Sequence, residues 1–351
     1  MLTKNINFIN FKHKKKSTVV KLLLNSLLKQ NDEVIKSLRK SYKNSYDHKI
    51  LKVFNKKLDF RIIGMGGSIL GAHSIYDFLN QRIKKNFLFI NNLHNKKNKI
   101  FNKSYNNLII SKSGNTIETV INSNILIKKK DKNLFITENK ESYLKKLAIK
   151  LQGKVVDHNN YIGGRYSVLS EVGMLPAELM GLDPRKFRQL NNIIKNTKFL
   201  NSLVVNVSTI LFYLKKKKFN SIIINYDESS VNLFNWYQQL VAESLGKNNS
   251  GFLPIVSNMP KDNHSVMQLY LDGFKNNFFT FFFVKDKNSS KIKNKDILNE
   301  LNFLKNKDTN QIMYAQKLAT QNIFRKKNIP FRSFEVKKRD EKTLGELFSF
   351  F

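Results

Sequence analysis

The sequence predicts an α/β protein with two domains, each a three-layer αβα sandwich built on a mainly parallel sheet. Short apolar strands alternate with helical stretches along most of the 351 residues, which is the pattern of parallel sheets covered on both faces by helices. That length corresponds to about two domains. A hydrophobic share of 41% supplies material for two cores and excludes a wholly disordered chain.

The first 185 residues predict a helical lead-in followed by the first domain. Residues 17–45 carry apolar side chains at helical spacing, so we expect an N-terminal segment, residues 1–50, of one or two short helices. The first domain, residues 51–185, ends where Gly181 and the pair Asp183-Pro184 stop a helix. Its strands are expected at 60–63, 87–90, 108–110, 133–137 and 154–156, and its helices at 69–80, from about 117, and at 172–180.

A second alternating series predicts the second domain, residues 186–351. Its helices are expected near 199–216, 229–245, 265–271 and 308–325, and its strands at 221–224, 252–256, 278–284 and 331–336. The polar run 285–295 is expected to be a surface loop. A last helix is expected from Thr343 to the end of the chain.

The composition is strongly basic. Lysine and arginine number 62 against 26 acidic residues, a net charge of +36, and such a field attracts phosphate polyanions. Only nine of the basic residues are arginine, the residue that reads guanine bidentately. We interpret the charge as drift in codon composition, with no specific nucleic-acid partner, and expect weak polyanion binding that salt removes. A nucleic-acid binder with its lysines gathered on one face stays an alternative.

Several classes of protein and site are excluded. The absence of cysteine rules out a disulfide scaffold, a thiolate nucleophile, a Cys-ligated zinc and an iron–sulfur cluster. The six histidines form no metal-ligand spacing, and no nicotinamide or ATP motif occurs, so we expect neither cofactor nor metal. The longest apolar run, residues 278–284, is too short to span a bilayer. We expect a cytoplasmic protein without a membrane partner.

Two turns between a strand and a helix suggest phosphate binding. Residues 64–68, Gly-Met-Gly-Gly-Ser, follow a predicted strand, where backbone N–H groups and a helix N-terminus favour anions. A plain structural turn explains them equally well. Residues 111–119, Ser-Lys-Ser-Gly-Asn-Thr-Ile-Glu-Thr, gather four hydroxyl side chains and one lysine at the next such corner, where several can point at one small anion. The alternative there is an elaborate helix cap.

Arg165 and His264 have side chains suited to charge stabilisation and proton transfer. Arg165 follows the flexible pair Gly163-Gly164, and an arginine can stabilise an enediolate oxygen because it stays charged at every working pH. His264 precedes a predicted helix, whose N-terminus disfavours imidazolium and leaves a neutral ring that can accept or donate a proton. A solvated surface arginine and a loop histidine without a role are the ordinary alternatives.

Glu243 is the candidate general base. It shares one stripe of a predicted helix with Trp236 and Leu240, so we expect its carboxylate to face an apolar side, where desolvation favours a proton acceptor. Gln239 lies one turn earlier, beside it. A solvated surface glutamate is the alternative.

Five segments in order resemble the phosphoglucose isomerase (glucose-6-phosphate isomerase) family, whose members contain two sugar-isomerase (SIS) domains. The resemblance covers roughly residues 55–351 and rests on Gly-Met-Gly-Gly-Ser-Ile-Leu-Gly (64–71), the 111–119 segment, Gly-Gly-Arg-Tyr-Ser (163–167), Ala-Glu-Ser-Leu-Gly-Lys (242–247) and Lys-Asp-Asn-His-Ser-Val-Met-Gln-Leu-Tyr-Leu-Asp-Gly (261–273). The SIS loop alone is shared by many sugar-phosphate proteins, but five segments in order are highly specific. The resemblance implies interconversion of glucose 6-phosphate and fructose 6-phosphate, in glycolysis and gluconeogenesis.

The resemblance also implies roles for individual residues. Glu243 is expected to shuttle a proton between C2 and C1 of the open-chain sugar through a cis-enediol, Arg165 to stabilise the enediolate, and His264 to help open the ring. The residues expected to hold the substrate and its phosphate are Gly67, Ser68, Ser111, Lys112, Ser113, Thr116, Glu118, Gly164 and Gln239. In the family the histidine reaches into the partner subunit's site, which implies a homodimer with shared active sites.

One departure from the family concerns the end of the chain. The family continues well past the equivalent of residues 344–347 and supplies a catalytic lysine there, whereas Lys337, Lys338 and Lys342 all precede that segment. We therefore expect a truncated C-terminal end, with Phe348 and Phe351 exposed. A SIS-domain protein that binds or senses a sugar phosphate without turnover is the alternative function.

Overall fold

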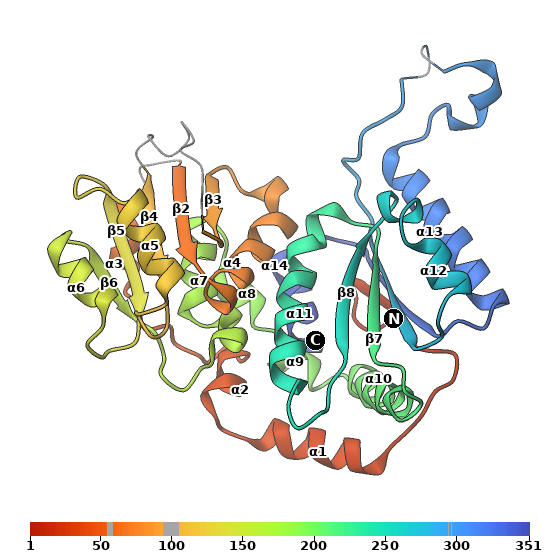
Figure 1. Cartoon of the computed structure of the whole chain (residues 1–351), viewed down its shortest axis with the longest axis horizontal. Coiled ribbons are helices and arrows are strands. Elements are labelled where there is room, and N and C mark those ends of the chain that lie inside the picture. The colour runs from red at the N-terminus through yellow and green to blue at the C-terminus, as the bar shows by residue number, and fades with distance from the viewer. Residues whose placement is uncertain (55–58, 94–104, 294, 296) are drawn as a thin grey trace.

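Two five-stranded sheets with helices around them form the architecture of the chain (Figure 1). The computed structural model describes residues 1–54, 59–93, 105–293, 295 and 297–351. All strand pairs are parallel except the pair that joins the first strand of the chain to the last. The predicted α/β class with mainly parallel sheets is confirmed.

The first sheet has the order β3-β2-β4-β5-β6. Its strands are β2 (Asp59–Gly64), β3 (Asn86–Ile90), β4 (Asn106–Ile110), β5 (Lys132–Thr137) and β6 (Lys154–Asp157), and its helices include α4 (Leu70–Phe78), α5 (Ile117–Leu126), α6 (Tyr143–Lys150) and α7 (Glu171–Leu179). The chain moves from β2 outward to β3 and then returns to the other side of β2 to form β4. In an open parallel sheet, ligands bind at the carboxyl ends of the strands where the order switches in this way.

The second sheet repeats this order as β8-β7-β9-β10, with β1 added at the far edge. Its strands are β1 (Ile6–Ile9), β7 (Asn220–Asn225), β8 (Leu253–Asn258), β9 (Asn277–Val284) and β10 (Phe331–Val336), and its helices are α10 (Thr197–Lys215), α11 (Val231–Leu245), α12 (Met267–Asp272), α13 (Thr309–Lys326) and α14 (Glu341–Phe350). All eight residues of β9 are buried, as expected for a central strand covered on both faces.

The prediction of a helical segment over residues 1–50 is wrong for residues 6–9. Three helices do occur near this segment, namely α1 (Thr18–Lys29), α2 (Glu33–Ser37) and α3 (His48–Phe54). Before them, β1 pairs antiparallel with β10, so that Phe8 lies opposite Phe334 and their rings are 4.5 Å apart. Nothing in the local sequence indicates this pairing, because the partner strand β10 is at the other end of the chain.

One apolar core runs through both halves of the molecule. The same cluster of buried side chains includes Ile62 of β2, Leu175 of α7, Trp236 of α11 and Phe334 of β10. Two short helices, α8 (Pro184–Phe187) and α9 (Leu190–Ile193), lie where the boundary near residue 185 was predicted, and α14 packs against α8. The domain boundaries remain predictions, and the shared core fixes α11 relative to the first sheet.

The C-terminal helix is buried, contrary to the expectation that Phe348 and Phe351 are exposed. Phe348 is only 5% exposed, and its ring stands edge-on to Trp236 at 4.8 Å. Phe351 is partly buried and lies 4.8 Å from the ring of Tyr237. The helix fits between the two halves, where its apolar stripe faces α11 and α9 rather than solvent.

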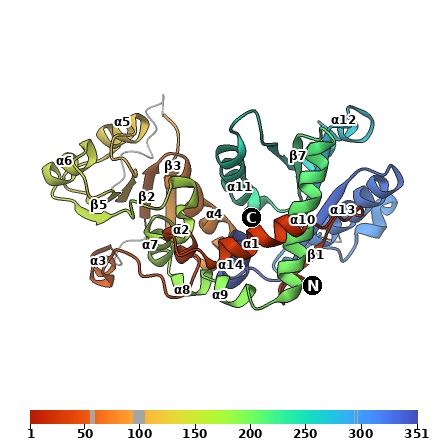
Figure 2. The same ribbon diagram turned by 90° about the horizontal axis from the view of Figure 1, so that it is seen from below.

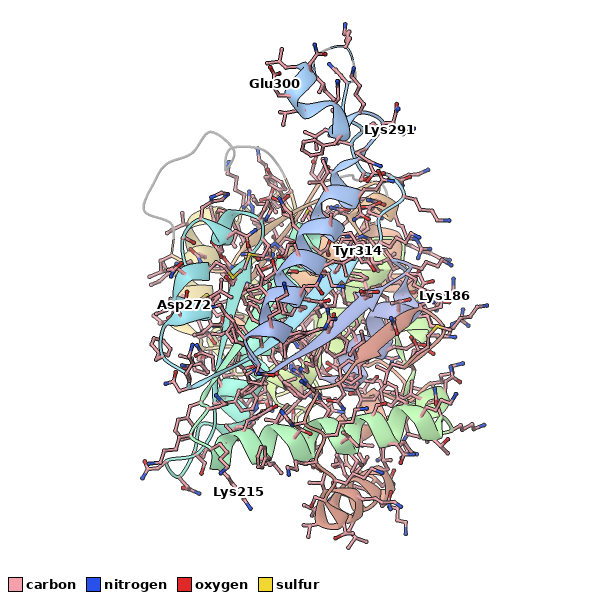
Figure 3. All side chains as sticks on the ribbon, turned by 90° about the vertical axis from the view of Figure 1, so that its right-hand side faces the viewer. Lys186, Lys215, Asp272, Lys291, Glu300 and Tyr314 are labelled. Carbon is pink, nitrogen blue, oxygen red and sulfur yellow. The ribbon has the colours of Figure 1, made fainter. Side chains whose placement is uncertain are left out.

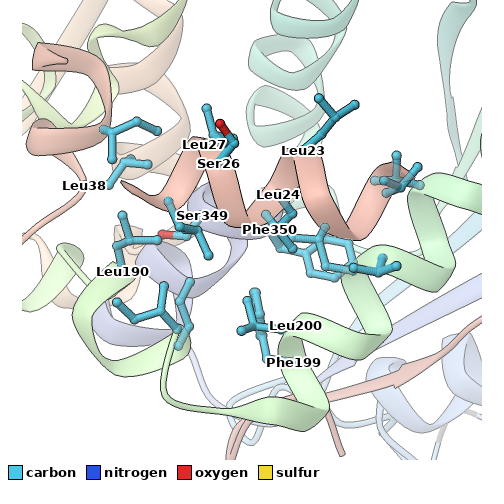
Figure 4. A pocket seen from close by; sticks show the side chains of 18 of the residues that line it. Leu23, Leu24, Ser26, Leu27, Leu38, Leu190, Phe199, Leu200, Ser349 and Phe350 are labelled. Carbon is cyan, nitrogen blue, oxygen red and sulfur yellow. The ribbon is translucent and has the colours of Figure 1, made fainter. Parts of the chain in front are cut away.

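An apolar hollow of about 610 Å³ separates α1 from α10 and α14. Figure 4 shows Leu24, Leu200 and Phe350 among its lining side chains, and Figure 2 shows α1 alongside α10. Among the described residues, α10 is the one helix long and apolar enough to cross a membrane by length and composition. A core helix of a soluble protein passes the same test, so this feature is weak evidence for a membrane span.

Candidate active site

The two predicted phosphate loops lie side by side at the point where the order of the first sheet switches. Gly64 at the end of β2 is in register with Ile110 at the end of β4. A β-carbon on Gly64 would be only 3.0 Å from the carbonyl oxygen of Ile110. Because both loops leave the carboxyl ends of adjacent parallel strands, they face one common crevice.

Two glycines let the first loop contact the segments that carry the predicted catalytic residues. Gly66 has φ +52°, and a β-carbon there would be 2.8 Å from Nε2 of Gln239. A β-carbon on Gly67 would be 2.6 Å from the backbone nitrogen of Arg165, and the Ser167 hydroxyl donates to the Gly67 carbonyl at 3.3 Å. Side chains at either position would push the loop away from α11 and from residues 163–167.

Arg165 and Glu243, from opposite halves of the molecule, form a direct ion pair. Nη1 of Arg165 donates to Oε1 of Glu243 at 2.8 Å, and Gln239 donates to the other carboxylate oxygen at 3.1 Å. Ser244 accepts from Nε of Arg165 at 2.9 Å and bonds the Tyr166 hydroxyl at 2.9 Å. Two bonds to α11 therefore fix the plane of the guanidinium.

The electrostatics of this cluster favour charged side chains. Burial alone would lower the pKa of Arg165, but Tyr166 and Glu243 outweigh it and raise that pKa. Burial would raise the pKa of Tyr166, yet the hydrogen bond with Ser244 and the nearby Arg165 lower it. The guanidinium also lies 4.6 Å from the centre of the Tyr166 ring. The site thus contains a fixed cation beside a carboxylate.

The expectation that Glu243 faces an apolar side is wrong. Its side chain is 50% exposed, whereas Trp236, two turns earlier on the same stripe, is buried. The last turn of α11 extends beyond the core, so the stripe that begins among apolar side chains ends at the charged edge of the crevice. The carboxylate of Glu243 is therefore surrounded by solvent and the Arg165 guanidinium, and not by apolar side chains.

The second loop forms a hydroxyl-lined corner in front of α5. Ser111 Oγ and Thr116 Oγ1 are 2.9 Å apart, and Ser111 is buried. Thr116 occupies the N-cap of α5, but within the described part of the chain no side chain caps this helix. The alternative reading of the segment as an elaborate helix cap is therefore wrong for Thr116. Uncapped N–H groups and paired hydroxyls are suited to an anion.

Gly114 determines the shape of this corner. It has φ +67°, and a β-carbon there would lie 2.8 Å from Oγ1 of Thr137. The other predicted ligands lie around it, with Ser113 exposed and Glu118 half-buried in the first turn of α5. Lys112 donates to the Asn160 carbonyl at 2.8 Å and lies 3.5 Å from Glu138. The lysine therefore joins the second loop to the segment that leads to Arg165.

A continuous chain of contacts links the hydroxyl corner to the ion pair. Ser111 directly follows Ile110, which abuts Gly64, and two residues later Gly66 abuts Gln239. Gln239 in turn donates to Glu243. Gly164 lies beside Gly67, and Ser68 completes the short helix Gly66–Ser68. Except for His264, the predicted site residues thus lie on segments that these contacts bring together at the carboxyl-end edge of the first sheet.

His264 is the predicted residue that lies elsewhere. It follows the short helix Lys261–Asn263, beyond the carboxyl end of β8. Glu243 lies in the last turn of α11, which leads into the amino end of β8. Six residues of extended strand separate those two ends by about 20 Å. No contact joins His264 to Arg165 or Glu243 within the described residues of this chain, and the histidine is exposed.

Sequence reasoning missed Ser244 and Tyr166, the two neighbours that orient Arg165. Each directly follows a predicted catalytic residue, but their partnership spans 78 residues, and no pattern in the sequence indicates it. Among the residues that the structure describes, no group of three His, Cys, Asp or Glu side chains could hold a metal ion.

Comparisons with known proteins identify relatives of this chain. The family model for phosphoglucose isomerase matches residues 51–334. The glucose-6-phosphate isomerase of Methanocaldococcus jannaschii is 34% identical over 304 residues, covering 82% of this chain and 74% of that protein. The glucose-6-phosphate isomerase of Mycoplasmopsis pulmonis is 34% identical over 319 residues, covering 83% of this chain and 74% of that protein.

Solved structures share the fold. A hypothetical protein of Thermus thermophilus superposes with a TM-score of 0.77 at 20% identity, over 95% of this chain and 86% of that one. A glucose-6-phosphate isomerase of Chlamydia trachomatis gives a TM-score of 0.66 at 18% identity, over 86% of this chain and 65% of that one. With the family model matching most of its length, the chain belongs to the phosphoglucose isomerase family.

Proposed function

We propose that this protein interconverts glucose 6-phosphate and fructose 6-phosphate. The observation that carries the proposal is the ion pair of Arg165 and Glu243, which is linked through Gln239 and the first loop to the uncapped, hydroxyl-lined start of α5. A carboxylate base, a fixed cation and an anion site are sufficient for aldose–ketose isomerisation. The names of the relatives in Methanocaldococcus and Mycoplasmopsis support the same substrate pair.

The phosphate is proposed to bind at the corner formed by Ser111, Ser113 and Thr116, with Ser68 of the first loop on its other side. The uncapped N–H groups of α5 add favourable donors and the positive end of the helix dipole. Lys112 supplies a positive charge close by, although its ammonium is engaged by Asn160 and Glu138. Glu118 and Gln239 are proposed to contact the sugar, and Gly67 and Gly164 to leave room for it.

Proton transfer is assigned to Glu243. In the open-chain aldose the carboxylate removes the proton on C2, and the electrons move to the carbonyl oxygen on C1 to give a cis-enediolate. Arg165 lies beside the carboxylate and stabilises that negative charge. Return of the same proton to C1, with transfer of the hydroxyl proton from O2 to O1, gives the ketose. Atoms and charge balance without any cofactor.

Ring opening is assigned to His264 of a second copy of this chain. Within one chain the histidine is at the opposite end of β8 from Glu243, which is an unsuitable position for acting on the same sugar. A homodimer in which each subunit lends its histidine removes that difficulty. The proposed location is the cytoplasm, because a phosphorylated sugar carries charge that a bilayer excludes.

The test is an assay of purified protein with glucose 6-phosphate, in which fructose 6-phosphate is detected by a coupled reaction. We expect turnover in the unchanged protein and a loss of at least about a thousandfold in Glu243→Gln. Calorimetric binding of glucose 6-phosphate should survive in that variant, since the anion site is intact. Near-normal turnover in Glu243→Gln would refute the assignment of the base.

A further inference from the structure

Two adjacent hollows lie at the amino end of the second sheet, on a surface that the isomerase site does not use. The larger, of about 310 Å³, lies between β1, the end of α10 and the end of α13. The smaller, of about 180 Å³, lies between the ends of α10, α12 and α13. Both are lined by Asn328, Ile329 and Pro330, so the two hollows meet at the loop between α13 and β10.

The charged side chains around both hollows are basic. The larger hollow is lined by Lys12, His13 and Arg325. The smaller is lined by three lysines, Lys218, Lys275 and Lys327. Among the described residues, no aspartate or glutamate lines either hollow. Asp272 lies nearby, where Lys327 is paired with it at 2.5 Å. The surface thus has an excess of positive charge even after that pair is counted.

This arrangement is not a simple consequence of the net charge of +36. The hollow at the carboxyl ends of β7, β8 and β9 contains three carboxylates, those of Asp227, Glu228 and Asp286. A further polar hollow contains Glu178 and Asp183. Carboxylates therefore do enter the polar hollows of this molecule, and the surface at the amino end of the second sheet differs by lacking them.

Basic side chains from four separate segments line these hollows or are next in sequence to the residues that do. Figure 3 views this side of the molecule, with Lys215 at the end of α10 and Asp272 at the end of α12. We define the basic face as Lys12, His13, Lys14, Lys15, Lys16, Lys215, Lys216, Lys217, Lys218, Lys275, Arg325, Lys326 and Lys327, nearly all of them exposed. Lysine at a helix C-terminus is favourable in its own right, which accounts for part of the set. Residues 12–16 precede α1 and have no such explanation.

Two exposed phenylalanines lie within the basic face. Phe219 is 47% exposed and Phe274 is 53% exposed. They precede neighbouring strands, and the residue after Phe219, Asn220, donates to the backbone carbonyl of Asn276 at 3.2 Å. Lys218 also donates to the backbone carbonyl of Lys275, which holds the backbone segments before β7 and β9 together, and Phe274 lines the smaller hollow. Aromatic rings held among lysines are the combination that binds single-stranded nucleic acid, with phosphates on the cations and bases on the rings.

We propose that the basic face binds single-stranded nucleic acid without sequence preference. The predominance of lysine over arginine fits contact with phosphates rather than with base edges. The two hollows are large enough for a base, whereas an amphipathic helix that lies on a membrane presents a broad apolar face. The hollows share no lining residue with the Arg165 and Glu243 site, so binding and isomerisation use different residues.

The test is fluorescence anisotropy of a labelled oligothymidylate of about 20 nucleotides, titrated with the full-length protein from about 50 to 200 mM salt. The five lysine and arginine side chains of the two hollows predict a slope of log K against log salt of about −3.5. The variant Lys12→Glu/Lys275→Glu should bind at least about tenfold more weakly than the matched control Lys129→Glu/Lys130→Glu. The control makes the same change of net charge in an exposed turn before β5.

Phe274→Ala separates stacking from charge, and because the side chain is exposed we expect the variant to fold as the unchanged protein does. It should weaken oligothymidylate binding about tenfold and leave binding of inorganic polyphosphate unchanged. Isomerase activity should be equal in all these variants. Equal losses in the two double variants, no binding at the lowest salt, or binding to phosphatidylglycerol vesicles in preference to the oligonucleotide would each overturn the proposal.

Discussion

The Arg165 guanidinium donates to the Glu243 carboxylate at 2.8 Å, although the two residues are 78 positions apart and belong to opposite halves of the molecule. Glu243 is half exposed, and an ion pair at such a surface contributes little to stability. The pair is therefore better explained by the chemistry of the crevice than by folding. Its geometry depends on neighbours that can be changed one at a time.

Ser244→Ala removes the acceptor that orients the Arg165 guanidinium through Nε. We expect kcat to fall about tenfold, since a hydrogen bond to a charged group is lost, while KM for glucose 6-phosphate changes little. Steady-state kinetics measures the split. Ser244→Thr, which keeps the hydroxyl, should recover most of the rate, and Ser250→Ala, in the loop after α11, should behave as the unchanged protein. A rise in KM alone would contradict a role in orienting the cation.

Gly67→Ala tests the close approach of the first loop to the segment carrying Arg165. A β-carbon at this position would be 2.6 Å from the Arg165 nitrogen, so the two segments must separate at a cost of about 1–3 kcal/mol. We expect a lower urea midpoint and a reduced kcat. Gly163→Ala is the matched control, because its β-carbon would be in ordinary contact, 3.4 Å from the Tyr166 ring. Equal stability of the two variants would show that the loop is not held as described.

Thr116→Val tests the proposed phosphate corner by removing the hydroxyl that lies 2.9 Å from Ser111 Oγ. The phosphate contact is made in ground and transition states alike, so KM should rise about tenfold with kcat nearly unchanged. Thr119→Val, one turn further along α5, is the control, because its buried hydroxyl has no hydrogen-bond partner among the described residues. An unchanged KM with a collapsed kcat would remove Thr116 from the anion site.

Local pattern predicted most of the fold. The strands expected at 278–284 and 331–336 are β9 and β10 almost residue for residue, and β9 is the nearly continuous apolar run that a central strand of a parallel sheet shows. The pattern failed at β1, a four-residue strand whose partner β10 is at the other end of the chain. Such a pairing depends on tertiary contacts that no window of local sequence contains.

The site was predicted unevenly for the same reason. The residue types around the crevice follow from motifs, and their roles remain predictions. The pairing of Arg165 with Glu243 and its support by Ser244 depend on two segments meeting in space. The spacing of Trp236 and Glu243 correctly predicted that they share one face of a helix. It could not predict that the last turn of this helix, α11, extends beyond the apolar core.

Phe348→Ala tests the burial of the C-terminal helix. The ring stands edge-on to Trp236 at 4.8 Å, so its removal should lower the free energy of unfolding by about 3–5 kcal/mol. Trp236 is the single tryptophan of the chain, and its fluorescence emission should shift to the red as water gains access. Phe303→Ala, at a side chain that is 70% exposed, should leave both the urea midpoint and the emission unchanged. An unshifted spectrum in Phe348→Ala would contradict the packing.

Stability should decline below about pH 6.5, because His158 is buried as a neutral ring. Burial lowers its pKa, and Glu171 only partly opposes that effect. As the pH falls below about 6.5, the pKa of histidine in the unfolded chain, the unfolded chain binds a proton that the folded chain does not. The free energy of unfolding then falls by up to about 1.4 kcal/mol per pH unit, until the pH reaches the pKa of His158 in the folded chain. Above about pH 6.5 the histidine is neutral in both the folded and the unfolded chain, so His158 does not affect the pH dependence of stability there.

Burial also lowers the pKa of His73. We therefore expect His158→Gln to remove part of the slope of stability against pH, and His73→Gln another part. Urea unfolding at intervals from about pH 8 to pH 5.5 measures it, with exposed His13→Gln as the control. An unchanged slope in both buried variants would assign the pH dependence to other groups.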